Sequence, residues 1–190
     1  MKWWKQRRRE PPAAVVQVRR GEGQPFGALD RYVPLRTGET ALYRAIREGV
    51  PIVDAAIWKL VRLCGGVSVQ CADRAARTGL EEFFRTVDAG WGQRGVQAFL
   101  DRYLDDLFTC GHGLGEVVLT PDGKDIAALL CADPAQVEVK LGDNPLDFRL
   151  CRTGIGENRE LPWQELLLFT PFQPTGDAPC GVSLLRSMPF

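Results

Sequence analysis

The spacing of the apolar residues changes at Gly111, and this change limits the folds that the chain can adopt. Up to Cys110 the apolar residues recur every three or four positions, which is the period of an amphipathic helix. After Gly111 they alternate, which is the period of a strand with one buried face. Helices followed by a run of strands predict an α+β fold, with N-terminal helices and then antiparallel β-hairpins.

The helical period predicts four helices, at residues 39–48, 51–64, 78–89 and 96–110. Gly49 is suited to end the first helix, and Pro51 is suited to the first turn of the second. Two apolar stripes follow the second helix, and we expect this helix to be largely buried, with Trp58 in the core. The stripes are Ile52, Ala56, Leu60 and Leu63, and beside them Val53, Ile57, Val61 and Cys64. A short strand is expected next, at residues 67–71.

The alternating period predicts strands at residues 115–120, 126–131, 137–141, 146–152 and 166–170. A Pro-Asp-Gly turn between the first two indicates a hairpin. Thr78 and Glu81 form a capping-box pattern at the start of the third helix. Ser183 is expected to cap a last helix at residues 183–188.

The first 36 residues differ from the rest of the chain in pattern and charge. The first twenty carry seven basic side chains and one acidic one, so the remainder sums to −6 in a chain of zero net charge. We therefore divide the chain into a basic, loosely ordered arm (residues 1–36) and an α+β domain (residues 37–190). Candidate contacts of the arm with nucleic acid or a partner are Trp3, Trp4, Lys5, Arg7, Arg8 and Arg9. A solvated terminus or a membrane-surface contact would explain the same residues.

Residues typical of catalysis are few. His112 is the single histidine, and its place between two glycines predicts a turn residue. Asp101, Asp105 and Asp106 are expected to form a solvated helix face rather than a metal site. Neither a phosphate-binding loop nor a Gly-x-Ser-x-Gly elbow occurs. We expect no enzymatic activity, no metal and no cofactor; a small enzyme that uses His112 or the aspartates stays an alternative.

The cysteines carry no signature of a metal or redox site, because no Cys-x-x-Cys pair occurs. They are Cys64, Cys71, Cys110, Cys131, Cys151 and Cys180. Most adjoin apolar residues, which favours buried free thiols. The N-terminus lacks the apolar run of a secretion signal, and no apolar stretch approaches the length of a membrane span. We therefore expect the chain to be cytosolic when it is made.

Several segments resemble the portal proteins of long-tailed (siphophage-type) bacteriophages in their order and approximate spacing. They are residues 51–67, 99–118, 129–139, 166–170 and 181–186. The third contains Asp-Pro-x-x-Val-x-Val and the last reads Gly-x-Ser-x-Leu-Arg. The likeness extends over roughly residues 42–188, and no single motif in it is specific. The family supplies no catalytic residue to look for.

The resemblance implies a structural subunit of a dodecameric ring at one capsid vertex, through which double-stranded DNA is packaged and ejected. The implied partners are other copies, the terminase large subunit, capsid and scaffold proteins and the head–tail connector, with no membrane and no small-molecule substrate. The implied location is the virion, after assembly in the cytoplasm of a bacterial host.

The segment would be the outer wing region of such a protein. Its abrupt apolar end at residues 184–190 predicts truncation before the stem and clip. The alternative function is a nucleic-acid-binding module that uses the basic arm.

Overall fold

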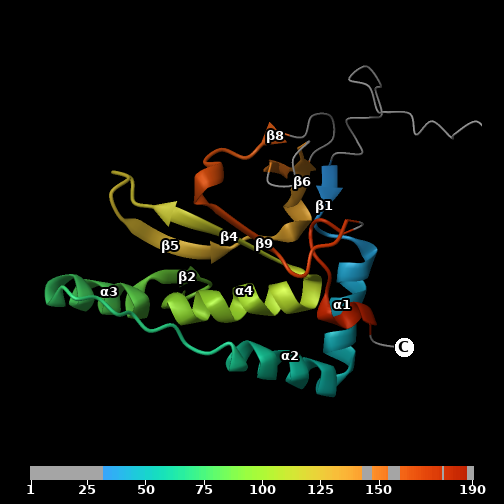
Figure 1. The fold of residues 1–190 in the computed structure, drawn as a ribbon, viewed down its shortest axis with the longest axis horizontal. Helices are drawn as coiled ribbons and strands as arrows, with labels where there is room; N and C mark the ends of the chain where they lie inside the picture. Colours follow the sequence, from blue (N-terminus) through green and yellow to red (C-terminus); the bar gives the residue numbers. More distant parts are fainter. Residues whose placement is uncertain (1–31, 143–146, 154–158, 177, 188–190) are drawn as a thin grey trace, which may run out of the picture.

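The computed structural model describes residues 32–142, 147–153, 159–176 and 178–187. Its helices lie in one layer and its two sheets in another, which confirms the predicted α+β class (Figure 1). The helices are α1 (Gly38–Gly49), α2 (Pro51–Leu63), α3 (Arg74–Thr86) and α4 (Val96–Cys110). The strands are β1 (Tyr32–Pro34), β2 (Asp88–Gly90), β3 (Gln93–Arg94), β4 (His112–Leu119), β5 (Ile126–Cys131), β6 (Val137–Leu141), β7 (Phe148–Arg152), β8 (Arg159–Glu160) and β9 (Leu167–Pro171).

The strands form two sheets. One has the order β1-β6-β7-β8, and all its pairings are antiparallel. The other has the order β3-β2-β5-β4-β9, in which the predicted β4–β5 hairpin is present and β9 pairs antiparallel with β4. It departs from the predicted antiparallel pattern at the parallel pair of β2 with β5, where Asp88 lies opposite Ala128.

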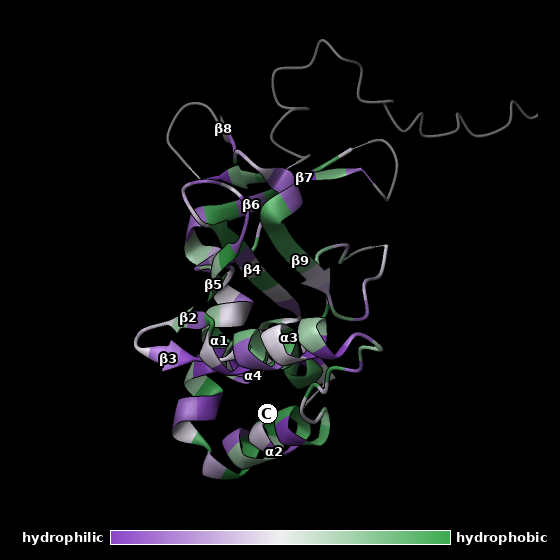
Figure 2. Ribbon diagram, turned by 90° about the vertical axis from the view of Figure 1, so that its left-hand side faces the viewer, coloured by the Kyte–Doolittle hydropathy of each residue, from purple (hydrophilic) through white to green (hydrophobic). Residues whose placement is uncertain are grey.

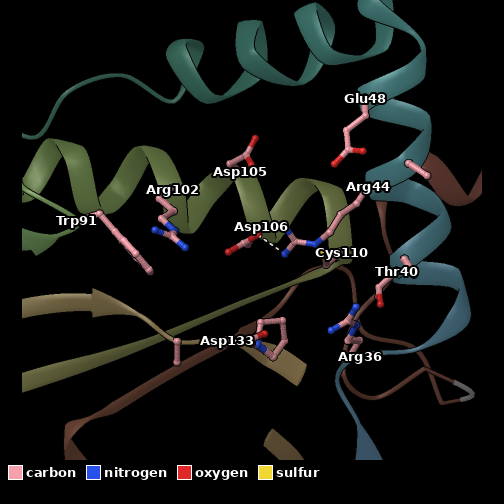
Figure 3. Close-up of a pocket in the computed structure, with 14 residues that line it drawn as sticks. Arg36, Thr40, Arg44, Glu48, Trp91, Arg102, Asp105, Asp106, Cys110 and Asp133 are labelled. Atoms are coloured by element: carbon pink, nitrogen blue, oxygen red, sulfur yellow. Dashed lines mark hydrogen bonds and ion pairs between the residues drawn. The ribbon is translucent and has the colours of Figure 1, made fainter. Parts of the chain in front are cut away.

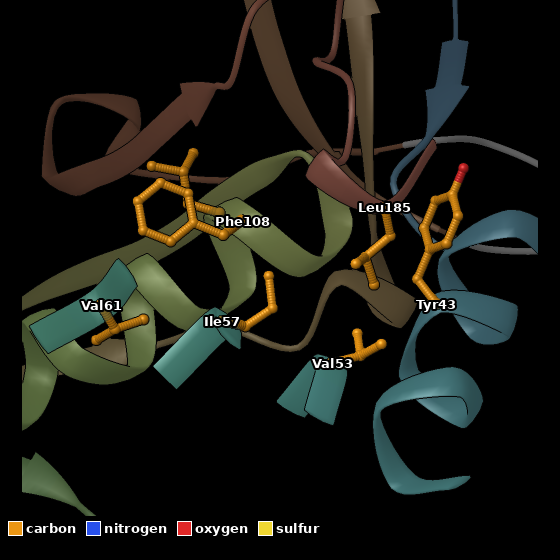
Figure 4. Close-up of a cluster of buried hydrophobic side chains, with 7 residues drawn as sticks. Tyr43, Val53, Ile57, Val61, Phe108 and Leu185 are labelled. Atoms are coloured by element: carbon orange, nitrogen blue, oxygen red, sulfur yellow. The ribbon is translucent and has the colours of Figure 1, made fainter. Parts of the chain in front are cut away.

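Helix α4 organises the core, because its apolar face contacts both layers. Phe99 and Tyr103 pack under β4 and β5, while Leu107 and Phe108 pack against α2 and the final 3₁₀ turn (Leu184–Ser187). Leu107 and Phe108 belong to a cluster of buried side chains that Figure 4 shows. In this cluster Leu185 lies among side chains from α1, α2 and α4. The cluster consists of Tyr43, Val53, Ile57, Val61, Leu107, Phe108 and Leu185.

The turn from α4 into β4 depends on glycine. Gly111 ends α4 with a φ of 85°, a left-handed conformation that side chains other than glycine rarely adopt. A Cβ atom at Gly111 would lie 2.6 Å from the backbone of Val182 and Ser183. The chain thus reverses direction at Gly111 while the 181–183 segment packs directly on the turn.

Several predicted elements differ from the structure. The predicted strand at residues 67–71 is absent, because this segment pairs with none of the described strands and links α2 to α3. Helix α3 begins four residues before the predicted capping box, since Asp73 Oδ1 accepts a hydrogen bond from the Ala75 amide at 2.8 Å. Thr78 therefore lies inside the helix, where its hydroxyl donates to the Arg74 carbonyl. The predicted helix at residues 183–188 is a 3₁₀ turn, and Ser183 Oγ caps it by accepting from the Leu185 amide at 3.0 Å.

The ordered domain begins earlier than predicted. Strand β1 pairs with β6, and Leu35 is buried in the core beneath the four-stranded sheet. Residues 32–36, which the sequence pattern places in the arm, therefore belong to the domain. The other residues of the predicted arm lie outside the described part of the chain.

Candidate functional site

Arg47 of α1 joins three helices through charged hydrogen bonds. Its Nε donates to Asp54 Oδ1 on α2 at 3.0 Å, and its Nη1 donates to Thr109 Oγ1 on α4 at 2.7 Å and to Asp105 Oδ1. The Arg47 side chain is only 10% exposed, so these partners replace water that the guanidinium would otherwise bind. The junction fixes the angle between α1, α2 and α4.

A second ion pair lies one turn earlier on α1. Arg44 Nη2 donates to Asp106 Oδ1 of α4 at 2.7 Å. Burial raises the pKa of Asp106 above its ordinary value, although Arg44 acts to lower it. Asp105 and Asp106 thus face α1, and the prediction that the aspartates of α4 form a solvated face is wrong for these two. Asp101, one turn before them, accepts a hydrogen bond from Gln97 on the exposed side.

These two aspartates border a cleft of about 580 Å³ between α1, α4 and the β5–β6 connection (Figure 3). Its charged lining consists of Arg36, Arg44, Arg102, Glu48, Asp105, Asp106 and Asp133. Three cations face four carboxylates, so the cleft offers no net attraction to a phosphate group. This excess of carboxylates makes the cleft a poor site for a nucleotide or a nucleic-acid backbone.

Trp91 stands at the edge of the cleft, at the tip of the β2–β3 hairpin (Figure 3). Trp91 and Gly92 both have positive φ, 54° and 77°, as the two central residues of a type I′ turn do. Tryptophan is unfavourable there, and its side chain is 89% exposed. Neither this hairpin nor the projecting indole was predicted from the sequence.

His112 and Cys110 lie two residues apart at the junction of α4 and β4, but their protonation states oppose nucleophilic catalysis. Burial raises the pKa of the Cys110 thiol to about 11, so it is protonated at neutral pH. Burial, with a contribution from Arg44, lowers the pKa of His112 to about 4, so its ring is neutral. A thiolate–imidazolium pair would need the reverse of both shifts.

His112 is a buried strand residue, and the prediction of a turn position is wrong. It is 5% exposed, lies opposite Pro171 of β9 and has its ring 6.4 Å from that of Phe169. Its Nε2 atom has no hydrogen-bond partner among the described residues. Of its two neighbouring glycines, Gly111 has a positive φ and Gly113 does not, because Gly113 already belongs to β4.

Helix α2 has one buried and one exposed apolar stripe. Val53, Ile57 and Val61 face the core, as predicted. The stripe of Ile52, Ala56, Leu60 and Leu63 faces outward, with Ile52 77% and Leu63 68% exposed. The predictions that this helix is largely buried and that Trp58 belongs to the core are therefore wrong, because Trp58 is also exposed.

Of the remaining predicted residues, some are placed as expected, some are not, and some lie outside the described part of the chain. All six cysteines are free; Cys110, Cys151 and Cys180 are buried as predicted, whereas Cys64 is exposed and Cys71 and Cys131 are intermediate. Trp3, Trp4, Lys5, Arg7, Arg8 and Arg9 lie outside the described residues. Within the described ranges, no cluster of three metal-binding side chains occurs. The helices of those ranges are all too short or too polar to cross a bilayer.

Comparison with known proteins gives a fold and no family. Neither a protein family nor a curated protein matches the sequence. Among solved structures, the fold is similar to a chain in the neck of an empty gene transfer agent (GTA) particle, determined with C6 symmetry. The TM-score is 0.57 at 19% sequence identity, over 78% of this chain. The chain spans 41% of the length of that neighbour.

Proposed function

We propose that this chain is a structural subunit of a phage-like particle, located where head and tail meet. The observation that carries the proposal is the fold similarity over 78% of the chain to a protein of a particle neck. The ordered set of portal-like motifs in the sequence supports the same role independently of that similarity. Both point to particle architecture rather than to a soluble enzyme.

Within that region, we assign the chain to a portal-type ring, as its wing portion. The partners would be further copies of the chain, the terminase large subunit, capsid and scaffold proteins and the head–tail connector. The exposed apolar stripe on α2 supports a subunit that packs against other protein, because helices bury such stripes when a partner is present. The rigid Arg47 junction supports it too, since a ring subunit must hold its contact surfaces at fixed angles.

The proposed role is non-catalytic. Its support is the chemistry of the Cys110–His112 neighbourhood, where the protonated thiol supplies no thiolate nucleophile and the neutral imidazole supplies no imidazolium acid. The cleft adds to this, because its carboxylates outnumber its cations and a substrate with phosphate groups would gain nothing by entering it.

Disruption of the gene in the organism that encodes the chain tests the proposal. Particles made without the protein should contain less DNase-protected DNA, by at least tenfold, and the intact gene supplied in trans should restore it. A control gene with an early stop codon should fail to restore it. Particles with normal DNA content in the disrupted strain would refute the assignment.

The alternative function, nucleic-acid binding by the N-terminal arm, is favoured by the seven basic side chains and two tryptophans in the first twenty residues. On this alternative, deletion of residues 1–20 abolishes a salt-sensitive mobility shift on duplex DNA. An unchanged mobility shift would exclude the arm as the DNA contact. If the intact chain gives no shift at all, nucleic-acid binding is excluded as the function.

A further inference from the structure

We propose that the outer stripe of α2 docks into an apolar groove at the opposite end of a second copy of this chain. The outer stripe is defined as Ile52, Ala56, Leu60 and Leu63. The inference rests on the proposed function, because a ring of identical subunits needs two different, complementary surfaces on each one.

The outer stripe has the geometry of a helix-packing surface. Its residues recur at intervals of four, four and three, so they form one line along the whole helix. This line lies beside the stripe that packs on α4, and Figure 2 shows α2 at the edge of the molecule with no described element beyond it. A helix with apolar stripes on two sides gains stability when both are covered, because apolar surface is then removed from water.

A receiving surface is present on the sheet layer. An apolar groove of about 500 Å³ lies between β6, β7, β9 and the segment after β9. Its apolar lining includes Val139, Leu141, Phe148, Phe169, Pro174 and Pro179. The volume is in the range of pockets that enclose ligands much larger than one side chain, so it can take more than one residue of a helix.

The stripe and the groove lie at opposite ends of the fold. In Figures 1 and 2, which differ by a quarter turn, α2 lies at the bottom while β6 or β7 lies at the top. One copy can therefore use its α2 while its own groove receives the α2 of the next copy. Such a head-to-tail contact generates a ring when the rotation between neighbours closes.

Charge favours a second copy of this chain as the occupant. Lys59 and Arg62 are exposed on α2, whereas Asp54 of this helix is paired inward with Arg47. The outer side of α2 is thus positive, while residues 37–190 as a whole carry a formal charge of −6. The opposite charges of the outer side of α2 and of the domain as a whole favour contact between α2 of one copy and the body of another.

Two single substitutions test the two surfaces, and a third provides the control. Leu63→Asp places a charge in the outer stripe, and Pro174→Asp places one at the groove, both at exposed positions. Leu42→Asp changes a leucine of α1 that is likewise exposed, 53%, but belongs to neither surface. Circular dichroism confirms that each variant is folded before sedimentation measures its self-association.

The proposal predicts that the unsubstituted chain and Leu42→Asp self-associate, and that Leu63→Asp and Pro174→Asp each do so at least tenfold more weakly. A mixture of the last two variants should form a one-to-one heterodimer, because each retains the surface that the other has lost. No larger species should form from that mixture.

Three results would overturn the proposal. If Pro174→Asp self-associates normally, then α2 pairs with α2 or with another site, and if Leu63→Asp does so, α2 is not the contact. An unsubstituted chain that is monomeric at every concentration shows that something other than a second copy covers the stripe. The proposed function survives any of these, since the DNA content of particles decides it separately.

Discussion

His112 carries a buried ring nitrogen without a partner among the described residues, which couples its protonation to folding. Its pKa is about 4 in the folded protein, against 6.5 for an exposed histidine side chain. The unfolded chain therefore binds the proton more readily than the folded protein does. The contribution of the neutral ring to the free energy of unfolding is complete above pH 6.5 and is lost as the pH falls towards 4. The surrounding groups that oppose the charge are Arg44 and the apolar neighbours of the ring, including Phe169.

We predict that His112→Leu removes this pH dependence. Between pH 7.5 and pH 5, the unsubstituted chain should lose about 2 kcal/mol more free energy of unfolding than the variant, because the two pKa values differ by about 2.5. Urea unfolding at both pH values measures the difference, and comparison of the two proteins cancels the contribution of the carboxylates. An equal loss in both proteins would mean that His112 is solvated.

Arg47 is the charged residue whose removal should matter most. Arg47→Met leaves Asp105 and Thr109 without their partner at a site that water reaches poorly, so we expect a loss of roughly 2–3 kcal/mol in the free energy of unfolding. The matched control is Arg77→Met, which breaks an exposed pair with Glu81 one turn along α3 and should cost less than about 0.5 kcal/mol. Similar losses for both variants, measured by urea unfolding, would contradict a structural role of the junction.

At the scale of elements, the closeness of α4 to β4 depends on a residue without a side chain. A Cβ atom at Gly113 would lie 2.5 Å from the ring of Tyr103, which is held in place by a 2.8 Å hydrogen bond to Thr170. Gly113 is therefore required by packing, since its φ is not positive.

Gly113→Ala should lower the free energy of unfolding by about 1–3 kcal/mol, because either Tyr103 or β4 must move. Gly79→Ala is the contrasting variant, as Gly79 lies inside α3 with nothing within 4 Å of the added Cβ. It should raise the free energy of unfolding by roughly 0.5–1 kcal/mol. Thermal unfolding of both proteins checks the opposite signs, and a neutral Gly113→Ala would show that the α4–β4 contact is looser than described.

The sequence patterns predicted an element correctly where its cause lies in adjacent residues, and they failed where it depends on residues far away in the chain. Helix α4 has its predicted bounds, because its apolar period and the glycine after it are both properties of adjacent residues. The predicted strand at residues 67–71 failed because alternation alone does not supply a neighbouring strand to pair with. Periodicity also gave both stripes of α2 without showing which one faces the core, since that depends on where α4 lies.

The candidate site was predicted less well than the fold, because its contacts join residues far apart in sequence. Arg47 is separated from Asp105 by 58 positions and from Thr109 by 62, and no local pattern connects them. The aspartates of α4 drew attention as a cluster, but only the position of α1 turns two of them into ion-pair partners. A signal was available in the basic residues of α1, Arg44 and Arg47, which recur on one helix face.

At the scale of the whole molecule, an α+β body with a rigid helical junction presents an apolar helix at one end and an apolar groove at the other. These features suit a building block that is fixed between neighbours. The fold is similar to that of a chain in a particle neck, at 19% sequence identity. The function that we propose for the chain, and the central claim to test, is that of a structural subunit in the head–tail region of a phage-like particle.

The most direct test of this claim is the position of the protein in purified particles. Gold-labelled antibodies against the chain should mark a single site per particle, where head and tail meet, in electron micrographs. Label spread over the whole head, or particles that contain none of the protein, would contradict the claim.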